Sequence, residues 1–294
     1  MGEPMCDQDD FHTMNYARSV NLSRRQFGAL VAGSGLVSLL PALADAAPIA
    51  GSSVAIRTPD GICDAYFTHP TTGAHPGVLM WPDIFGLRPT FRAMADRLAG
   101  SGYAVLVVNP FYRIKRAPTS PPHPDFNDPA TRKELMRLMD SLTPETTVTD
   151  ARAFVPWLDD RGAVSKTRKM ASTGYCMGGP FTLRTAAAFP DRIGAGATFH
   201  GAALVTDKPD SPHLLIPHIK AQYLMAIAAS DDAKQPQAKT ILREAFRNAH
   251  LEAEIKVYPG TLHGWCVPDS RVYNPVQAEN AWARQLVLLK RALA

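Results

Sequence analysis

Short apolar segments alternate along this chain with longer amphipathic ones, and the alternation restricts the possible folds more than any other feature. Runs such as Gly77–Trp81 and Ala104–Asn109 have the length and composition of buried strands. The stretches that follow them, such as Thr90–Ala99, carry apolar residues at helical spacing. Strands that alternate with helices indicate βαβ units and a mostly parallel sheet with helices on both faces.

The whole region from residue 47 to 294 fits this pattern, without an internal repeat or a linker, so we expect one α/β domain. Thr143-Pro144-Glu145 has the order of an N-cap, a proline in the first turn and an acid near the helix dipole. Pro118–Pro129 is too rich in proline for a helix or a central strand and predicts a loop. The predicted strands are Val54–Arg57, Cys63–Thr68, Gly77–Trp81, Ala104–Asn109, Lys169–Thr173, Gly194–Phe199, Gln222–Ala228 and Ala253–Tyr258, and the predicted helices are Thr90–Ala99, Pro129–Ser141, Glu145–Asp160, Gly179–Phe189, Gln235–Ala249 and Val276–Leu293.

The composition excludes several classes of protein. Of 294 residues, 46% are hydrophobic and 20% are charged, as expected for a globular protein with a sizeable core. The net charge is only +4 and the basic residues form no stripe, so we expect no nucleic-acid partner. Four cysteines are too few for a disulfide framework, although Cys63 and Cys266 leave one disulfide open. No His/Cys/Asp cluster has the spacing of a zinc site, so neither metal nor cofactor is expected.

The N-terminal segment has the features of an export signal. Arg24 and Arg25 precede an uncharged stretch from Phe27 to Ala44, and small residues around Ala46 suit a cleavage site. The paired arginines resemble a twin-arginine signal. We therefore predict that residues 1–46 engage the twin-arginine export machinery and that residues 47–294 are periplasmic or extracellular, with no stable membrane anchor after cleavage.

Two alternatives remain for this segment: a retained anchor helix, or a chance Arg-Arg pair. The acidic residues before Met14 are unusual in a signal, and Met14 is a second candidate start.

A glycine-rich turn around Cys176 is the strongest indication of chemistry. Gly174-Tyr175-Cys176-Met177-Gly178-Gly179 lies between a predicted strand and a predicted helix, which is the setting of the nucleophile turn Gly-x-Ser-x-Gly with cysteine in place of serine. A thiol at the start of a helix is near unpaired N–H groups and the positive end of the dipole, which lowers its pKa. Cys176 is therefore the candidate nucleophile.

An acid and a histidine follow in the order that such a nucleophile requires. Asp231 comes shortly after the strand Gln222–Ala228, and His263 comes after the strand Ala253–Tyr258. The carboxyl ends of parallel strands meet at one edge of a sheet, so we expect Cys176, Asp231 and His263 to lie together. Asp232 is adjacent and is an alternative to Asp231.

Three motifs together resemble the dienelactone hydrolase family of α/β-hydrolases: the cysteine turn, Pro82-Asp83-Ile84-Phe85-Gly86 and His263-Gly264-Trp265. The resemblance extends from about Val54 to the C-terminus. It implies an α/β-hydrolase fold, with Cys176 as nucleophile, His263 as general base and acid, and Asp231 as the orienting carboxylate. It also implies that the backbone N–H groups of Ile84 and Met177 form the oxyanion hole.

The chain departs from the family pattern at the acid that accepts the thiol proton and at the two arginines that hold a substrate carboxylate. The family usually has Glu at the position of Asp83. It has an arginine two residues after the tyrosine of a Pro-Phe-Tyr segment, where this chain has Tyr112, Arg113 and then Ile114. A second family arginine, four residues after the histidine, is replaced by Val267.

The resulting prediction is a hydrolase of enol lactones or activated esters that forms a thioester on Cys176. A thiolate expels an enolate or phenolate more readily than an alkoxide or an amide nitrogen, because the enolate and phenolate are less basic. His200 and Trp265 are further candidates for the pocket, beside Asp83, Tyr112 and Arg113. The alternatives are a broader exported carboxylesterase, a non-catalytic binding protein on the same fold and, with least support, a redox role for Cys176.

Overall fold

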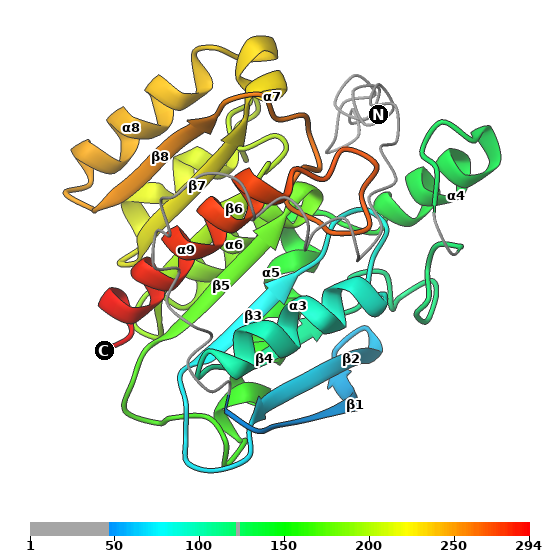
Figure 1. The fold of residues 1–294 in the computed structure, drawn as a ribbon, viewed down its shortest axis with the longest axis vertical. Helices are drawn as coiled ribbons and strands as arrows, with labels where there is room; N and C mark the ends of the chain where they lie inside the picture. The colour runs from blue at the N-terminus through cyan, green and yellow to red at the C-terminus, as the bar shows by residue number, and fades with distance from the viewer. Residues whose placement is uncertain (1–46, 122–123) are drawn as a thin grey trace, which may run out of the picture.

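A sheet of eight strands runs through the middle of the computed structural model, which describes residues 47–121 and 124–294 (Figure 1). The strand order is β1-β2-β4-β3-β5-β6-β7-β8. β2 pairs antiparallel with both β1 and β4, and every other neighbouring pair is parallel. The strands are β1 Ile49–Thr58, β2 Gly61–Pro70, β3 Gly77–Trp81, β4 Ala104–Val108, β5 Met170–Tyr175, β6 Ile193–Phe199, β7 Gln222–Ala228 and β8 Ala253–Tyr258.

Helices cover both faces of this sheet. α3 and α9 pack on one face, and α5, α6 and α8 pack on the other (Figure 1). The helices are α3 Pro89–Gly100, α4 Pro129–Met139, α5 Pro144–Asp159, α6 Gly179–Ala188, α7 Ala229–Lys234, α8 Ala238–Asn248 and α9 Pro275–Ala292, with short 3-10 turns η2 Cys176–Gly178 and η3 Pro212–His218.

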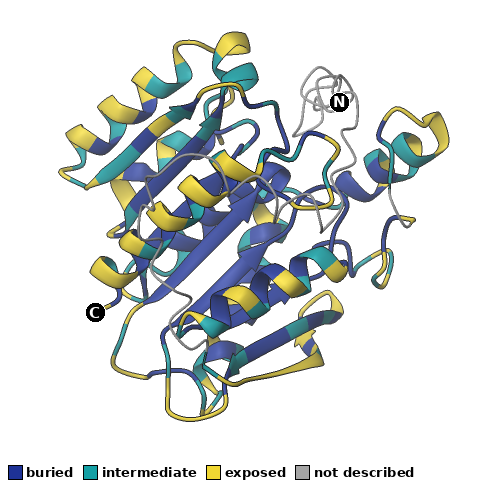
Figure 2. Cartoon of the chain, viewed as in Figure 1, coloured by how far each residue is buried: buried dark blue, intermediate teal, exposed yellow. Residues whose placement is uncertain are grey.

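The central strands are apolar throughout because both of their faces are covered. Along β3, Val78 and Met80 belong to the core beneath α3 and α9, whereas Leu79 and Trp81 belong to the opposite core. All four side chains are fully buried. Figure 2 shows the same burial in the neighbouring strands, while β1 is largely exposed. Continuous apolar runs are thus the sequence signature of a sheet between two helical layers.

The expected α/β architecture is confirmed, with all eight predicted strands present. The first two strands are longer than predicted, because they pair with each other from Thr58↔Gly61 out to Ile49↔Pro70. Most residues of β1 are exposed, so its sequence lacks the continuous apolar run from which the full length of the strand could be predicted. α7 was not predicted, since its six residues contain no buried side chain.

The capping prediction at Thr143 is confirmed. Its hydroxyl accepts a hydrogen bond from the Thr146 N–H and the Thr146 hydroxyl accepts one from the Thr143 N–H, so the two residues form a capping box. The predicted export signal lies outside the described residues. Within residues 47–121 and 124–294, no helix is both long and apolar enough to span a bilayer.

Candidate active site

Cys176 lies at a sharp turn between β5 and α6. Its φ is +51°, in the left-handed region that a residue with a side chain rarely adopts. The turn is formed by η2, and Pro180 sits in the first turn of the helix that follows. Strained backbone of this kind persists only where surrounding contacts impose it.

Two glycines allow the chain to pass through this turn. A Cβ atom on Gly174 would lie 2.1 Å from the Gly178 carbonyl oxygen, and one on Gly178 would lie 2.6 Å from the Trp81 carbonyl oxygen. Both distances are shorter than any real contact of a Cβ atom. The glycines on either side of Cys176 are therefore required by the close approach of backbone, as the motif suggests.

A chain of hydrogen bonds joins Cys176 to a histidine and an acid. His263 Nε2 lies 3.1 Å from Cys176 Sγ, and His263 Nδ1 lies 2.9 Å from Asp231 Oδ2. The His263 backbone N–H donates to Ser230 Oγ at 3.0 Å, which ties the histidine loop to the start of α7. The structure thus brings together the three residues expected to form a triad.

The neighbouring acid, Asp232, points elsewhere. Its carboxylate forms an ion pair with Lys239 of α8 at 2.6 Å. Asp231 instead turns toward His263, so the geometry selects Asp231 of the two candidates.

The charges around His263 favour its protonated form. Burial by itself would lower the pKa of His263, which is fully buried. The negative charges of Asp231 and Cys176 and their hydrogen bonds outweigh the burial, and they hold the pKa well above its ordinary value of 6.5. A thiolate–imidazolium pair is the arrangement that these contacts stabilise.

Both candidate oxyanion donors are buried residues. Ile84 follows β3 and is fully buried, and Met177 follows Cys176 directly and is fully buried as well. The hydroxyl groups of Thr119 and Ser120 both donate to the Phe85 carbonyl, at 3.1 and 3.0 Å. These bonds fix the loop that carries Ile84 against the Pro-rich segment.

Asp83 is buried in an ion-pair network. Both of its carboxylate oxygens accept hydrogen bonds from Arg88, at 2.6 and 2.9 Å. Arg88 also donates to both oxygens of Asp269, at 2.8 and 2.9 Å. Burial would raise the pKa of Asp269, but the bonds and charge of Arg88 lower it. This network connects the loop after β3 to the loop that carries His263.

Arg88 was not among the predicted site residues. The sequence feature that could have indicated Arg88 is its position five residues after Asp83, in the loop that carries the Pro82–Gly86 motif. Its second partner, Asp269, is 181 residues away in sequence, and no local sequence pattern predicts a contact over that separation.

Tyr112 and Arg113 belong to a different network. The Tyr112 hydroxyl donates to Asp150 Oδ1 at 2.7 Å. Arg113 donates to both oxygens of Asp150, at 2.7 and 2.9 Å, and forms an ion pair with Asp60 at 2.6 Å. The guanidinium is thus held between α5 and the β1–β2 turn by two carboxylates, which gives it a structural role and leaves it unsuited to hold a substrate carboxylate.

His200 lies beside His263, whereas Trp265 lies in the core. The His200 ring is buried, and its centroid is 5.1 Å from that of His263 at an interplanar angle of 76°. Trp265 is fully buried beneath α3 and α9, with its ring 4.6 Å from that of Tyr258. Of these two pocket candidates, only His200 is adjacent to the triad.

The two other described cysteines are free thiols. Cys63 donates to the Asn109 carbonyl at 3.4 Å, and Cys266 is buried in the core beneath α3 and α9. The disulfide left open by the sequence is therefore absent between these two residues. Among residues 47–121 and 124–294, no group of three or more His, Cys, Asp or Glu side chains is placed to hold a metal ion.

A small recess of about 30 Å³ adjoins the histidine loop. Gly264, which follows His263, and Phe85, which follows Ile84, both line it. Asp83, Arg88 and Phe126 complete much of the wall. Cys176 and His263 are themselves fully buried, and the recess comes next to His263 in the chain through Gly264.

Sequence comparison identifies the family. The profile of the "Dienelactone hydrolase family" matches residues 63–293. The chain belongs to the dienelactone hydrolase family. A relative from Escherichia coli (strain K12), named "Putative carboxymethylenebutenolidase", is 27% identical over 274 residues, which cover 91% of this chain and 96% of the relative. A "Probable 2-oxo-3-(5-oxofuran-2-ylidene)propanoate lactonase" from Bradyrhizobium sp is 23% identical over 231 residues, covering 77% and 88%.

Structural comparison supports the same fold. A crystal structure described as "Putative Dienelactone Hydrolase from Klebsiella pneumoniae" superposes with a TM-score of 0.71 at 23% identity, covering 83% of this chain and 99% of that one. The protein is thus a hydrolase of the dienelactone hydrolase type with the α/β-hydrolase fold, as the sequence motifs predicted.

Proposed function

We propose that this dienelactone hydrolase family member is a cysteine hydrolase that cleaves enol lactones or aryl esters through a thioester on Cys176. One observation carries the proposal: the hydrogen-bonded chain from Cys176 through His263 to Asp231, at a left-handed turn between a strand and a helix. Nucleophile, base and orienting acid are the three groups that acyl transfer requires.

The first half of the reaction forms the thioester. The Cys176 thiolate attacks the carbonyl carbon, and the backbone N–H groups of Ile84 and Met177 stabilise the resulting oxyanion. The bond from carbon to the leaving oxygen then breaks, and protonated His263 donates its proton to that oxygen. Asp231 keeps the imidazole oriented throughout these steps.

The second half releases the acid. His263 removes a proton from a water molecule, and the water oxygen attacks the thioester carbon. The carbon–sulfur bond breaks, the carboxylic acid departs, and the thiolate–imidazolium pair is restored. The charge of Cys176 is one cause of the raised pKa of His263, and the thioester removes that charge, so His263 gives up its proton more readily in the second half.

His200 supports the second half in this proposal. Its two ring nitrogens are buried, and neither has a hydrogen-bond partner among the described residues. A buried polar group without a partner costs free energy, so such a group requires an explanation. Burial and the charge of His263 lower the pKa of His200, so it stays neutral while His263 is charged. A neutral imidazole there is suited to accept a hydrogen bond from the attacking water.

The charges near the site favour an uncharged substrate. Arg88 is saturated by Asp83 and Asp269, and Arg271 of the recess forms an ion pair with Asp125 at 3.0 Å. Arg113 is held by two other carboxylates. This pairing favours a second candidate function, a carboxylesterase of broader specificity for uncharged esters, over a hydrolase specific for lactones that carry a carboxylate.

Hydrolysis assays distinguish these functions. Wild type and Cys176→Ala are compared on a dienelactone, on p-nitrophenyl acetate and on the p-nitrophenyl half-ester of adipic acid. We expect wild type to cleave p-nitrophenyl acetate faster than its carboxylate-bearing counterpart, and Cys176→Ala to be inactive on both. Equal activity of wild type and Cys176→Ala would refute the cysteine mechanism. A preference for the dienelactone and the half-ester would instead favour carboxylate recognition.

A further inference from the structure

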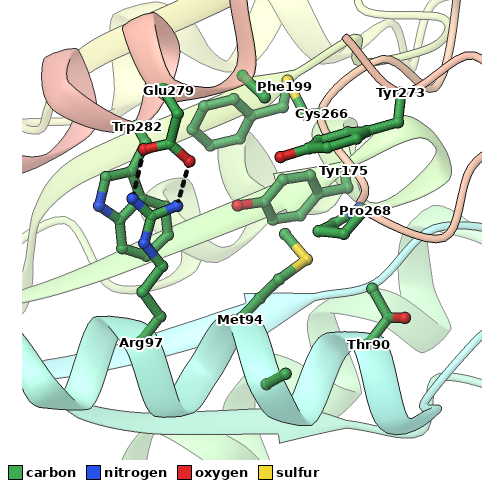
Figure 3. A pocket seen from close by; sticks show the side chains of 12 residues that line it. Thr90, Met94, Arg97, Tyr175, Phe199, Cys266, Pro268, Tyr273, Glu279 and Trp282 are labelled. Carbon is green, nitrogen blue, oxygen red and sulfur yellow. Dashed lines mark hydrogen bonds and ion pairs between the residues drawn. The ribbon is translucent and has the colours of Figure 1, made fainter. Parts of the chain in front are cut away.

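A second cavity is lined by Tyr175 and Phe199, the aromatic residues that directly precede Cys176 and His200 in the chain. Its volume is about 260 Å³, and it is bounded by α3, α9, the carboxyl ends of β5 and β6, and the loop after His263 (Figure 3). Cys176, Asp231 and His263 do not line it. The cavity is therefore separate from the triad, and its existence does not depend on the reaction proposed above.

Aromatic rings form much of its wall. Tyr175 and Phe199 are register partners on β5 and β6, and their rings stack with centroids 4.7 Å apart and an interplanar angle of 12°. Tyr273 and Trp282 line the cavity from the loop and from α9, and Met94 lines it from α3. Flat rings and a polarizable thioether favour a planar apolar ligand.

The polar groups of the cavity carry little net charge. Arg97 and Glu279 lie together at one side, where two hydrogen bonds of 2.7 and 2.5 Å join them (Figure 3). Arg97 also lies over the Trp282 ring, 4.2 Å from its centroid. The two opposite charges lie side by side, so the pair adds no net charge to the cavity wall. The hydroxyl groups of Tyr175 and Tyr273 turn toward this side of the cavity (Figure 3), where they can exchange hydrogen bonds with a ligand.

We propose that this cavity binds a small uncharged aromatic molecule that bears a hydroxyl or carbonyl group. The volume is just below the range of about 300–1,000 Å³ for sites of drug-sized ligands, so one or two fused rings fit. The ring stacks among Tyr175, Tyr273 and Trp282, and its polar group faces the tyrosine hydroxyls.

The position of this site connects it with the residues of the first. Tyr175 directly precedes Cys176 and Phe199 directly precedes His200, and both of these following residues have left-handed backbone, with φ of +51° and +40°. Cys266, which also lines the cavity, is three residues after His263. A bound ring would therefore contact the aromatic pair whose strands present Cys176 and His200.

Calorimetric titration with 2-naphthol tests the proposal, because this probe is planar, uncharged at pH 7 and carries one hydroxyl. Ala278 is buried on α9 and lines the cavity, so Ala278→Leu fills part of it. Ala283, which is exposed on the same helix, provides the matched control Ala283→Leu. Melting curves verify that all variants are folded.

We expect 2-naphthol to bind wild type, Cys176→Ala and Ala283→Leu alike, and to bind Ala278→Leu about tenfold or more weakly. The carboxylate analogue 2-naphthoate should bind wild type more weakly than 2-naphthol. Absence of binding to wild type, equal binding by folded Ala278→Leu, or a crystal structure that places 2-naphthol against Cys176 and His263 would each overturn the proposal.

Discussion

The imidazole of His200 stands edge-on to that of His263, with 5.1 Å between the ring centroids. Its backbone is fixed there, because the His200 N–H donates to the Ala226 carbonyl at 2.8 Å. The next turn is joined to the nucleophile as well, since the Ala202 N–H donates to the Cys176 carbonyl at 3.1 Å. His200 is therefore held in a fixed place relative to both Cys176 and His263.

Replacing His200 should slow release of the acyl group more than its transfer. His200→Phe keeps an aromatic ring but removes both nitrogens, so the attacking water loses its second partner. We expect the steady-state rate on p-nitrophenyl acetate to fall by about 10- to 100-fold while the initial burst remains fast. His200→Gln, which keeps a donor and an acceptor, should recover part of the rate. If burst and steady state fall together, His200 serves substrate binding or folding instead.

The His263 pKa predicts how stability depends on pH. The folded-state pKa is raised above 6.5, so the associated stabilisation is fully present below about pH 6.5 and is lost as pH rises through the folded-state value. Urea unfolding of wild type and Cys176→Ala at several pH values measures this dependence. Removing the thiolate removes one cause of the shift, so the loss should begin near pH 6.5 in both proteins but end at lower pH in Cys176→Ala. Identical pH profiles would show that the thiol contributes nothing to the shift.

The network around Arg88 should contribute strongly to stability. Arg88 is 7% exposed, and Arg88→Met would leave two carboxylates without their shared partner. Breaking a buried pair in this way costs about 3–5 kcal/mol. The exposed pair between Arg137 and Glu134 supplies the control, where Arg137→Met should lower the free energy of unfolding far less than Arg88→Met. Similar losses in the two variants by urea unfolding would argue against a special role for the network.

Gly178→Ala should disable the nucleophile turn. The added methyl group would lie 2.6 Å from the Trp81 carbonyl oxygen, so the turn must shift and Cys176 must move with it. We expect hydrolysis to fall to the level of Cys176→Ala, with a lower melting temperature. Gly162→Ala is the control, because a Cβ atom there meets nothing within 4 Å. Full activity in Gly178→Ala would show that the turn tolerates a side chain.

The N-terminal arginines predict a route of export. If residues 1–46 form a twin-arginine signal, then replacing both Arg24 and Arg25 by lysine should prevent export while the protein still accumulates inside the cell. Fractionation followed by immunoblotting measures the distribution, with Arg18→Lys as the control. Unchanged export of the double variant would favour a different signal or a chance Arg-Arg pair.

The sequence predicted best the positions of residues that directly follow the strands of the parallel sheet. β5, β6, β7 and β8 are consecutive neighbours in the sheet, so residues after their carboxyl ends must share one edge. Cys176, His200, Asp231 and His263 follow these four strands in the same order. The sequence predicted that Cys176, Asp231 and His263 meet, because each follows a strand expected in one parallel sheet, and this requires no knowledge of side-chain conformation.

Contacts between distant loops could not be predicted in this way. Whether Arg113 was available to a substrate depended on Asp60 and Asp150, which lie 53 and 37 residues away. The Arg88–Asp269 contact and the second cavity likewise depend on how the loop after β8 folds over α3, and no periodic pattern encodes that arrangement.

Trapping the acyl-enzyme shows whether Cys176 is the residue that forms the thioester. The protein is mixed with p-nitrophenyl acetate, quenched with acid within the burst, and examined by intact-mass and peptide mass spectrometry. We expect one added acetyl group, located on the peptide that contains Cys176 and absent in Cys176→Ala. Turnover of the ester with no acetyl group on Cys176, or with the same product formed by Cys176→Ala, would contradict this role of Cys176.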